Sequence, residues 1–321
     1  MKAQEENSLQ QSIPYSLPYK TGYWLIKLLN LSLNTFLVLI LLISALIGVY
    51  GLWDNSRING EADSSSWVGY KPEKEDTQSF EELKAINSEV QAWLTIYGTG
   101  IDYPVLYSED EWKYLNHDPK GKFSLAGSLF YDSVTHPSEN IFPTVIYGHH
   151  MNSGKMFGDL DKFLQEDFFR SHKYGYYFYD GRGYGVEILG VMKADAYDSE
   201  IYRHNKQDVQ SRKNYWEKTI TPRLIHKADT KVKETDRLLL LSTCANDATN
   251  GRTIVFARAT DQLYEDTFVP EENTGFDLKD VGWFGIPYYA WILLVVALLL
   301  AFIYFLVRYR RNKNKKSKEN V

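Results

Sequence analysis

Two long stretches without a charged side chain lie near the two ends of the sequence, at residues 28–53 and 283–307. Each exceeds the roughly 20 residues that an apolar helix needs to cross a bilayer, so the pattern predicts two transmembrane helices. Polar residues near the start of the first stretch limit its hydrocarbon-spanning part to residues 35–50. Aromatic side chains gather at both ends of the second, as they do at membrane interfaces. A cleavable signal peptide is the alternative for the first stretch, but its apolar region is long for one and no A-x-A site follows.

A single domain with a β pattern is predicted between these stretches. Residues 54–78 and 266–282 are polar and turn-rich, so we expect them to be linkers that flank a domain at residues 79–265. A domain of about 190 residues can bury one good hydrophobic core. Eight runs in it are rich in β-branched and aromatic residues and are bounded by Gly, Pro, Asp or Asn, which is typical of strands. These runs are residues 93–98, 102–108, 124–132, 143–150, 174–180, 184–198, 236–244 and 252–260.

Helical patterns are few in this domain. Ser79 and Glu82 have the spacing of a capping box, which predicts a short helix that ends near Ile86. Two further helical patterns interrupt the strands, at residues 157–172 and at about 207–225. Many short strands with few helices between them predict a mainly β fold, organised as a closed or nearly closed barrel.

The basic residues predict how the chain is oriented in the membrane. Lys20 and Lys27 precede the first span, and residues 308–321 hold seven basic residues against one glutamate. Because the cytoplasmic flanks of membrane helices carry the excess of Lys and Arg, residues 1–27 and 308–321 are both predicted to be cytoplasmic. The basic tail also suits contact with anionic membrane lipid. The central part, residues 54–282, then lies outside the cell.

The external part is acidic. The whole chain has 36 Lys and Arg residues and 41 Asp and Glu residues. Three basic and two acidic residues precede position 28, and seven basic and one acidic residue follow position 307, so 26 basic and 38 acidic residues remain, a net charge of −12. A surface of this sign argues against nucleic acid as a partner and is compatible with a cell-wall substrate.

Cys244 is the only cysteine in the sequence, so it cannot form an internal disulfide and is either a packing residue or a chemical group. It ends the apolar run 237–244, and a polar stretch follows at once. The end of a strand, where a loop begins, is a frequent position for catalytic groups. A free cysteine is also among the residues most often buried, so its position alone leaves a packing role open.

A nucleophilic cysteine needs a base or a cation beside it. His149 and His150 are the best placed histidines, because the strand-like run 143–150 ends in them as the later run ends in Cys244. The alternative is that an isolated histidine is a surface or core residue with other partners. A zinc site is disfavoured, because adjacent histidines point apart, no H-E-x-x-H motif is present and one cysteine supplies a single ligand.

Arg252 lies eight residues after Cys244 and opens the next strand-like run, so the two can face one another across a hairpin. The alternative is that Arg252 is an ordinary surface arginine in a salt bridge. Arg258, on the same run, is the internal control for that alternative.

Three segments resemble a sortase, and in particular a class B sortase. They are TVIYGHHMNSGKMFGDLDKF, LLLLSTCANDATNGRTIVFARA and INSEVQAWLTIYGTGIDYPVLYSEDEWKYLNHDPKGKFSLAGSLFYD. A Gly-His pair after a strand, a Thr-Cys pair at the end of another and an arginine eight residues on occur together in that family. The resemblance covers residues 79–263, and it departs from the family pattern at Leu240, where a threonine is usual.

The resemblance implies a fold and a catalytic set. The fold is an eight-stranded sortase barrel with an N-terminal helix and a helix-containing connection before the cysteine strand. Cys244 is implied as the nucleophile, and Arg252 as the group that steadies the substrate carbonyl and its oxyanion. The family's histidine directly follows the glycine, so His149 is implied as the general acid and His150 is not.

The implied reaction is a transpeptidation at the cell membrane of a Gram-positive type of envelope. Cys244 attacks the carbonyl of a threonine in a sorting signal near the end of a secreted protein, and a thioester forms. An amine from a peptidoglycan cross-bridge or from a pilin lysine then displaces the thiol. Ser242, Thr243 and Tyr202 are candidate substrate-binding residues. No metal, nucleotide or redox cofactor is required.

The role within the family stays open at this point. A C-terminal span is typical of pilin-polymerising sortases, whereas class B enzymes commonly have only the N-terminal anchor. The aspartate-proline-aromatic lid motif of the pilin class does not precede the domain. Two alternatives from other classes also stay open. One is a cysteine endopeptidase that passes the acyl group to water, and the other is a non-catalytic wall-binding or sensor domain in which Cys244 and His149 are incidental.

Overall fold

The computed structural model of the chain describes most of the sequence from residue 17 to residue 268. The described residues are 17–73, 77–110, 112–134, 142–202, 208–244 and 250–268, together with Tyr304 and Arg308. The chain divides into two compact units, Met1–Asp54 with Asp277–Val321, and Asn55–Phe276. The second unit contains the predicted catalytic domain.

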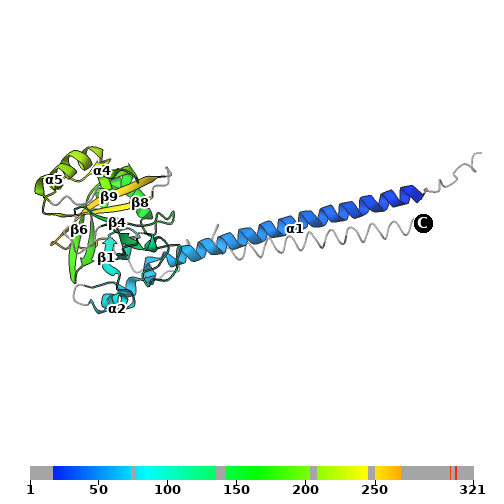
Figure 1. Cartoon of the computed structure of the whole chain (residues 1–321), viewed down its shortest axis with the longest axis horizontal. Helices are drawn as coiled ribbons and strands as arrows, with labels where there is room; N and C mark the ends of the chain where they lie inside the picture. The colour runs from blue at the N-terminus through cyan, green and yellow to red at the C-terminus, as the bar shows by residue number, and fades with distance from the viewer. Residues whose placement is uncertain are drawn as a thin grey trace, which may run out of the picture. The chain divides into compact units, whose positions relative to one another are not determined.

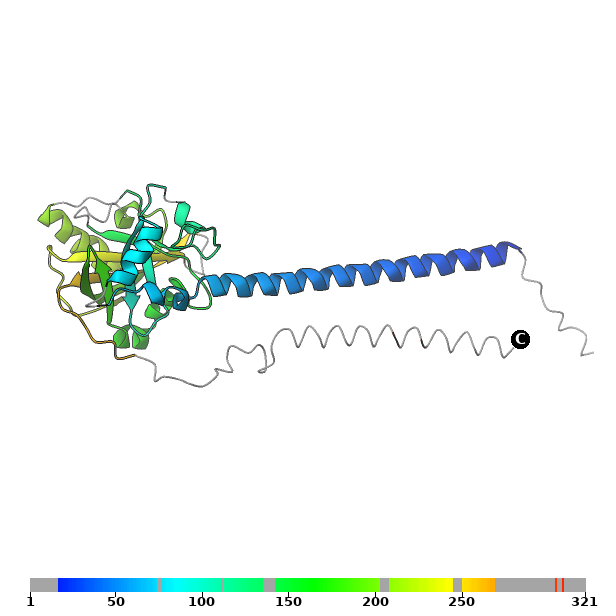
Figure 2. The ribbon, with the colours of Figure 1, turned by 90° about the horizontal axis from the view of Figure 1, so that it is seen from below.

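Eight strands of the second unit form a closed barrel, whose ribbon is drawn in Figures 1 and 2. In sheet order they run β5-β1-β2-β3-β4-β8-β9-β6, and β6 pairs with β5 to close the ring, while the two-residue β7 pairs with β6 outside it. The pairs β2–β3 and β4–β8 are parallel. The strands are β1 (Val90–Ile96), β2 (Asp102–Leu106), β3 (Leu129–Tyr131), β4 (Thr144–Tyr147), β5 (Tyr174–Tyr179), β6 (Arg182–Asp195), β7 (His226–Lys227), β8 (Arg237–Cys244) and β9 (Gly251–Thr260). The predicted eight strands and the closed barrel are confirmed.

The barrel wall separates two hydrophobic clusters, and β8 shows how. Leu239 and Leu241 belong to the larger cluster, which has members from every barrel strand and therefore fills the interior. Leu238 and Leu240 belong to a smaller cluster on the outer face. Successive side chains of a strand point to opposite faces, so the leucine run is buried on both sides. This explains why it lacks the alternation of polar and apolar residues that a half-exposed strand would have.

Short helices cover the outer cluster. The second predicted helical pattern is confirmed, with α5 (Val209–Asn214), the π-helical η5 (Tyr215–Ile220) and η6 (Thr221–Arg223), which follow the unpredicted α4 (Ser199–Tyr202). Apolar side chains of α4 and η5 pack on the outer face of β4, β6, β8 and β9, among them Ile201, Tyr215 and Trp216. The first predicted pattern is confirmed as η4 (Gly158–Leu164), a 3₁₀ helix, and α3 (Glu166–Ser171).

The predicted N-terminal helix is present as α2 (Gln78–Ile86). Its predicted capping box is wrong, because the N-cap position is Thr77 and Ser79 lies inside the helix. The Ser79 hydroxyl donates to the Lys71 carbonyl at 3.2 Å. The Ser79 hydroxyl therefore binds the preceding chain and does not cap the helix.

Most of one long helix, α1 (Leu17–Glu61), lies in the first unit (Figure 1). Its segment Thr21–Glu61 is long and apolar enough to span a membrane, and none of its most apolar window is buried. Length and composition therefore agree with the first predicted span. In the part of the chain that the structure describes, no other helix meets both criteria. The second predicted span, residues 283–307, lies outside that part except for Tyr304.

The predicted linker at residues 54–78 has more structure than expected. The second compact unit begins at Asn55, α1 continues to Glu61, and two 3₁₀ turns follow, η1 (Ser64–Ser66) and η2 (Val68–Tyr70). Ala62 and Trp67 are buried in the larger cluster. Ala62 and Trp67 stand among polar residues, so the sequence pattern gives no sign that they are buried. Some of these polar residues also contact the rest of the second unit.

Several polar contacts hold the end of α1 and the residues after it to the rest of the second unit. Lys155 Nζ donates to the Asn59 carbonyl at 2.8 Å and to the Asp63 carboxylate at 2.6 Å. The Ser124 hydroxyl donates to the Glu61 carboxylate at 2.8 Å. Burial of Asp63 raises its pKa, but the hydrogen bonds that the carboxylate accepts, first from Lys155, lower the pKa by a larger amount. The pKa therefore lies below its ordinary value. The carboxylate is therefore ionised at neutral pH.

Candidate active site

The backbone brings the three predicted catalytic residues to one level of the barrel. In the parallel pair β4–β8, Tyr147 lies beside Ser242, and the Gly148 N–H continues the ladder by donating to the Ser242 carbonyl at 3.2 Å. The register ends there; His149 and Cys244 are each two residues further along their segments, so a continuation of the same register would bring them to one level. In the antiparallel pair β8–β9, Cys244 lies directly opposite Arg252.

The three residues thus lie on neighbouring chain segments that are about 4.8 Å apart, the usual spacing between strands. Figure 1 shows β4, β8 and β9 next to one another. A histidine, a cysteine and an arginine at this spacing could act on one peptide bond. The sequence predicted that Cys244 and Arg252 can face one another across a hairpin, which the β8–β9 register confirms, and β4 lies on the other side of β8.

Gly148 fixes the point at which the histidine leaves β4. A Cβ atom at this position would lie 2.5 Å from Leu129 Cδ2 and 2.8 Å from ring atoms of Phe157. Those distances are too short for any side chain, so the backbone packs directly against its neighbours. In the Gly-His pair, the backbone at Gly148 therefore lies close to its neighbours, and the candidate histidine follows directly.

His149 is held by hydrogen bonds through its ring and its backbone. Its Nε2 lies 2.6 Å from the Leu115 carbonyl, and its own carbonyl accepts from the Phe157 N–H at 2.9 Å. Because a carbonyl can only accept, Nε2 carries the proton in this arrangement. In the neutral imidazole, Nδ1 is then the nitrogen that can exchange a proton with a substrate.

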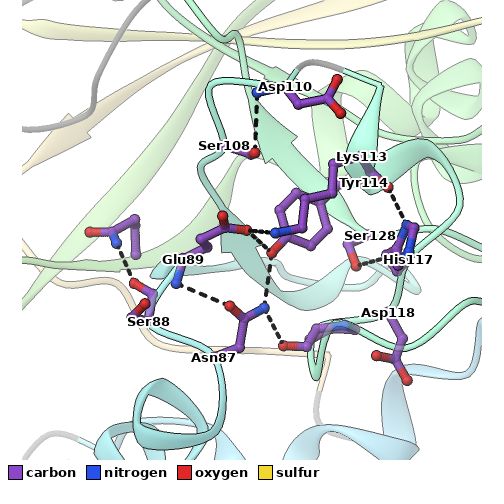
Figure 3. A network of polar contacts seen from close by, with 12 residues as sticks. Asn87, Ser88, Glu89, Ser108, Asp110, Lys113, Tyr114, His117, Asp118 and Ser128 are labelled. Carbon is purple, nitrogen blue, oxygen red and sulfur yellow. Dashed lines mark hydrogen bonds and ion pairs between the residues drawn. The ribbon is translucent and has the colours of Figure 1, made fainter.

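A polar network holds the segment that contains Leu115 (Figure 3). Glu89 accepts from Lys113 Nζ at 2.6 Å and from the hydroxyl of Tyr114. His117 Nδ1 donates to the Lys113 carbonyl at 2.8 Å. Burial raises the pKa of Tyr114 far above its usual range, so its hydroxyl stays a donor. The Leu115 carbonyl, which accepts from His149, is thereby held by contacts of the residues before and after it in the chain, Tyr114 and His117.

The two arginines of β9 are in different surroundings. Arg258 pairs with Glu187 at 2.7 Å and with Asp236 at 2.9 Å, and its side chain is 17% exposed. Burial lowers the pKa of Arg258, but the hydrogen bonds to Asp236 and Glu187 raise it by more, so the net pKa is raised. Arg252 is partly exposed at the start of the strand, opposite Cys244. A salt-bridge role, the alternative considered for Arg252, is present at Arg258, and the role of Arg252 stays a prediction.

The predicted substrate-binding residues lie close to the cysteine strand. The Tyr202 hydroxyl is 2.8 Å from the Ser242 hydroxyl, and its ring packs near that of Tyr147. Ser242 and Thr243 are fully buried. Substrate binding by these residues stays a prediction, and direct contact of Ser242 or Thr243 with a peptide would require the covering segments to move.

His150 faces a different group from His149. Its Nε2 donates to Asp161 Oδ2 at 2.9 Å, and Asp161 Oδ1 accepts from the Thr253 hydroxyl at 2.6 Å. Sequence reasoning did not single out Leu115, Asp161 or Thr253. It had no signal for them, because Leu115 acts through its backbone and Asp161 is one of several acidic residues in a helical run.

Within the ranges that the structure describes, no three His, Cys, Asp or Glu side chains lie close enough together to hold a metal ion. The described groups around His149 and Arg252 are those of acyl transfer: an imidazole with a fixed tautomer and a cation beside a cysteine position.

Comparisons with known proteins point to one family. The family model described as Sortase domain matches residues 94–260. The Sortase B of Listeria monocytogenes is 35% identical over 181 residues, which cover 54% of this chain and 71% of that protein. The Sortase B of Staphylococcus aureus is 29% identical over 181 residues, covering 56% of this chain and 73% of that protein.

Solved structures give the same result. The sortase B from the type II pilus of Streptococcus pneumoniae is 38% identical with a TM-score of 0.50, covering 57% of this chain and 99% of that chain. Both the matched domain and the eight-stranded barrel agree with the resemblance seen in the sequence. The chain therefore belongs to the sortase family of cysteine transpeptidases, and its relatives are class B sortases.

Proposed function

We propose that this sortase cleaves a sorting signal of secreted proteins after a threonine, forms a thioester on Cys244 and transfers the acyl group to an amine. The observation that supports this most is the strand pairing: Cys244 lies opposite Arg252, and β4, which His149 follows, pairs with β8 as far as Ser242. A packing cysteine would have no need of an imidazole and a guanidinium on either side.

The roles follow from the chemistry of these groups. The Cys244 thiolate attacks the threonine carbonyl, and the tetrahedral oxyanion forms beside Arg252, whose donors and charge contribute about 3–4 kcal/mol to its stabilisation. His149 takes the proton of the Cys244 thiol onto Nδ1 as the thiolate forms and gives it to the departing amine when the C–N bond breaks, and the thioester remains. The incoming amine returns the proton to His149 as it displaces the thiol. Ser242, Thr243 and Tyr202 are proposed to shape the site around the threonine.

The proposed setting is the outer surface of the cell membrane. Two spans, at residues 28–53 and 283–307, would anchor the domain with both termini in the cytoplasm. The acceptor is an amine of a peptidoglycan cross-bridge or of a pilin lysine. The relative from a type II pilus, together with the proposed C-terminal span, makes a pilin lysine the first acceptor to test.

The test uses the full-length enzyme in detergent and a library of quenched peptides with a fixed threonine. Mass spectrometry follows the adduct on Cys244, and the products are compared with and without oligoglycine, a diamino acid or a pilin-derived lysine peptide. A ligated product identifies a transpeptidase. Hydrolysis alone, with every amine present, identifies an endopeptidase, and the absence of any adduct on Cys244 sinks the enzymatic proposal.

A further inference from the structure

Beside the catalytic residues, a second set of polar side chains crosses the end of the barrel. His150, Asp161 and Thr253 come from three different segments, the loop after β4, the 3₁₀ helix η4 and the strand β9. We propose that His150 is a positioning residue for the transpeptidation, because through Asp161 it ties the loop that bears His149 to the strand that bears Arg252. This inference rests on the proposed function.

The contacts are short and shielded. One carboxylate oxygen of Asp161 accepts from His150 Nε2 at 2.9 Å and the other accepts from the Thr253 hydroxyl at 2.6 Å. The side chain of His150 is 7% exposed and that of Asp161 is 29% exposed. Rotation of the imidazole away from Asp161 would cost this hydrogen bond inside the protein, which holds the ring in one orientation.

The two ends of this chain of contacts are the immediate neighbours of catalytic residues. His150 follows His149, and Thr253 follows Arg252. Neighbouring residues of an extended chain point to opposite sides, so an anchor on one side leaves the other free to face a substrate. Holding His150 and Thr253 on one carboxylate therefore restricts the spacing between His149 and Arg252 beyond what the backbone ladder does.

The cysteine strand joins the same layer. Thr253 pairs directly with Thr243, and Thr243 precedes Cys244. Both threonines are fully buried and alternate in phase with the interior residues of their strands, Leu241 and Val255. The interior layer of the barrel end thus supports the level at which all three catalytic residues lie.

A loss of this tie should affect turnover more than substrate binding. His149 must bring Nδ1 within hydrogen-bond reach of the departing amine, at about 3 Å. Its described contacts with Leu115 and Phe157 connect it to other loops, so the His150 tie adds to the β4–β8–β9 ladder, which ends at Gly148, in holding its distance from β9. A shift of about 1 Å in a catalytic group can cost about 10²-fold in rate.

The test compares three substitutions of His150 in the full-length enzyme, with a quenched threonine peptide that the wild-type enzyme cleaves. His150→Gln keeps an amide donor near the place of Nε2, His150→Asn puts it nearer Nδ1, and His150→Ala removes it. We expect kcat to fall about 10- to 100-fold in the Asn and Ala variants, with KM changed by less than about threefold and Gln restoring most of kcat.

A double-substitution cycle checks the route through Asp161. Thr253→Val removes the hydroxyl at constant size and should also lower kcat. If Asp161 couples the two ends, the double variant of His150→Ala and Thr253→Val should be no slower than the worse single variant. Full additivity of the two losses would mean that the two ends act separately, which would overturn the proposed tie.

The matched control is His226, whose Nε2 donates to the Leu164 carbonyl at the other end of η4, at 2.8 Å. His226→Ala should leave kcat unchanged even if the melting temperature falls. Iodoacetamide alkylation of Cys244 checks that every variant keeps a reactive thiol. A His150→Ala enzyme with wild-type kcat, or an equal loss in His226→Ala, overturns the inference alone. A wild-type enzyme that forms no thioester overturns the proposed function, and the inference falls with it.

Discussion

Strand β9 carries an arginine near each end, and the two ends of the strand differ in what surrounds that charge. At the far end, the guanidinium of Arg258 is shared by the carboxylates of Glu187 and Asp236. At the near end, Arg252 lies opposite Cys244 in the β8–β9 register. One residue type, six positions apart on one strand, thus pairs with two acids in one place and lies opposite the proposed nucleophile in the backbone register in the other.

The difference shows that the partner decides what a charged side chain does. A guanidinium that is already matched by carboxylates contributes to the stability of the fold. A guanidinium beside a reacting carbonyl is useful for the charge that develops in the transition state. We therefore expect substitutions at the catalytic end to change rates at nearly constant stability, and substitutions at the far end to do the reverse.

The largest expected effect is that of Cys244→Ala. The change removes the nucleophile and little volume, so the thioester and all ligated product should disappear while the free energy of unfolding changes by less than about 1 kcal/mol. Mass spectrometry of the adduct and urea denaturation measure the two quantities. Transpeptidation that persists in this variant would end the thioester mechanism.

His149→Ala should come next. Loss of a general acid and base typically costs about 10²- to 10⁴-fold in rate, and the loss here should exceed that of His150→Ala. Single-turnover acylation of the same peptide gives the ranking. If His150→Ala proved the more damaging change, the imidazole in the site would have been assigned to the wrong residue.

The paired change to lysine sharpens the comparison most directly. Lysine keeps the charge but loses the planar fork of donors that holds an oxygen in place. Arg252→Lys should slow acylation by about 10²- to 10³-fold with little change in peptide binding. Arg258→Lys should keep the acylation rate and lose about 1–3 kcal/mol of stability, because it weakens hydrogen bonds to two carboxylates.

The comparison breaks if these two outcomes are exchanged. Wild-type acylation by the Arg252→Lys enzyme would move oxyanion stabilisation to backbone N–H groups near Cys244. An acylation defect in the Arg258→Lys enzyme, at unchanged stability, would mean that the far end of β9 also communicates with the reacting groups.

The smallest expected effect concerns acid and the contact of Asp63 with Lys155. The folded pKa of Asp63 lies below its ordinary value of 3.8, so the contact stabilises the fold above that pH and the stabilisation is lost as the pH falls through the lowered pKa. The Asp63 side chain is 39% exposed, so solvent screening limits its contribution to less than about 1 kcal/mol.

Melting temperatures of wild type and Asp63→Asn should therefore differ slightly at neutral pH and converge once the pH falls below the lowered pKa, where the carboxyl is protonated in both states. Lys155 lies in the segment between His150 and η4, so this pair connects that segment to the chain after α1. A difference that stays constant down to that pH would show that the Asn substitution acts through packing or backbone effects and not through charge.

Much of the barrel could be predicted because its signals are local. Each predicted strand run overlaps an observed strand, since β-branched and aromatic residues between turn-forming residues act within a few positions. The two-residue β7 and the four-residue α4 were missed because such short segments have no periodicity to detect. The linker prediction failed at Ala62 and Trp67, where two apolar residues within a polar segment were enough to bind it to the core.

The candidate site shows the same division between residues with a local sequence signal and contacts without one. Cys244, His149 and Arg252 could be proposed because each stands at the end or start of a strand-like run and matches a family pattern. The hydrogen bond between Asp161 and Thr253 joins residues 92 positions apart, and that between His149 and Leu115 uses a backbone carbonyl. Contacts of this kind depend on how the whole chain closes, so no local pattern in one sequence can reveal them.

The end of α1 sets a limit on how the catalytic domain can be produced without its anchor. A shortened protein that begins after Asp63 would lack the Asn59 carbonyl and the Glu61 and Asp63 carboxylates, which accept hydrogen bonds from Lys155 and Ser124. It would also lose Ala62 from the core. A soluble enzyme for crystallisation or inhibitor screening should therefore begin at about residue 55, where the compact unit begins, and keep the last turns of the helix.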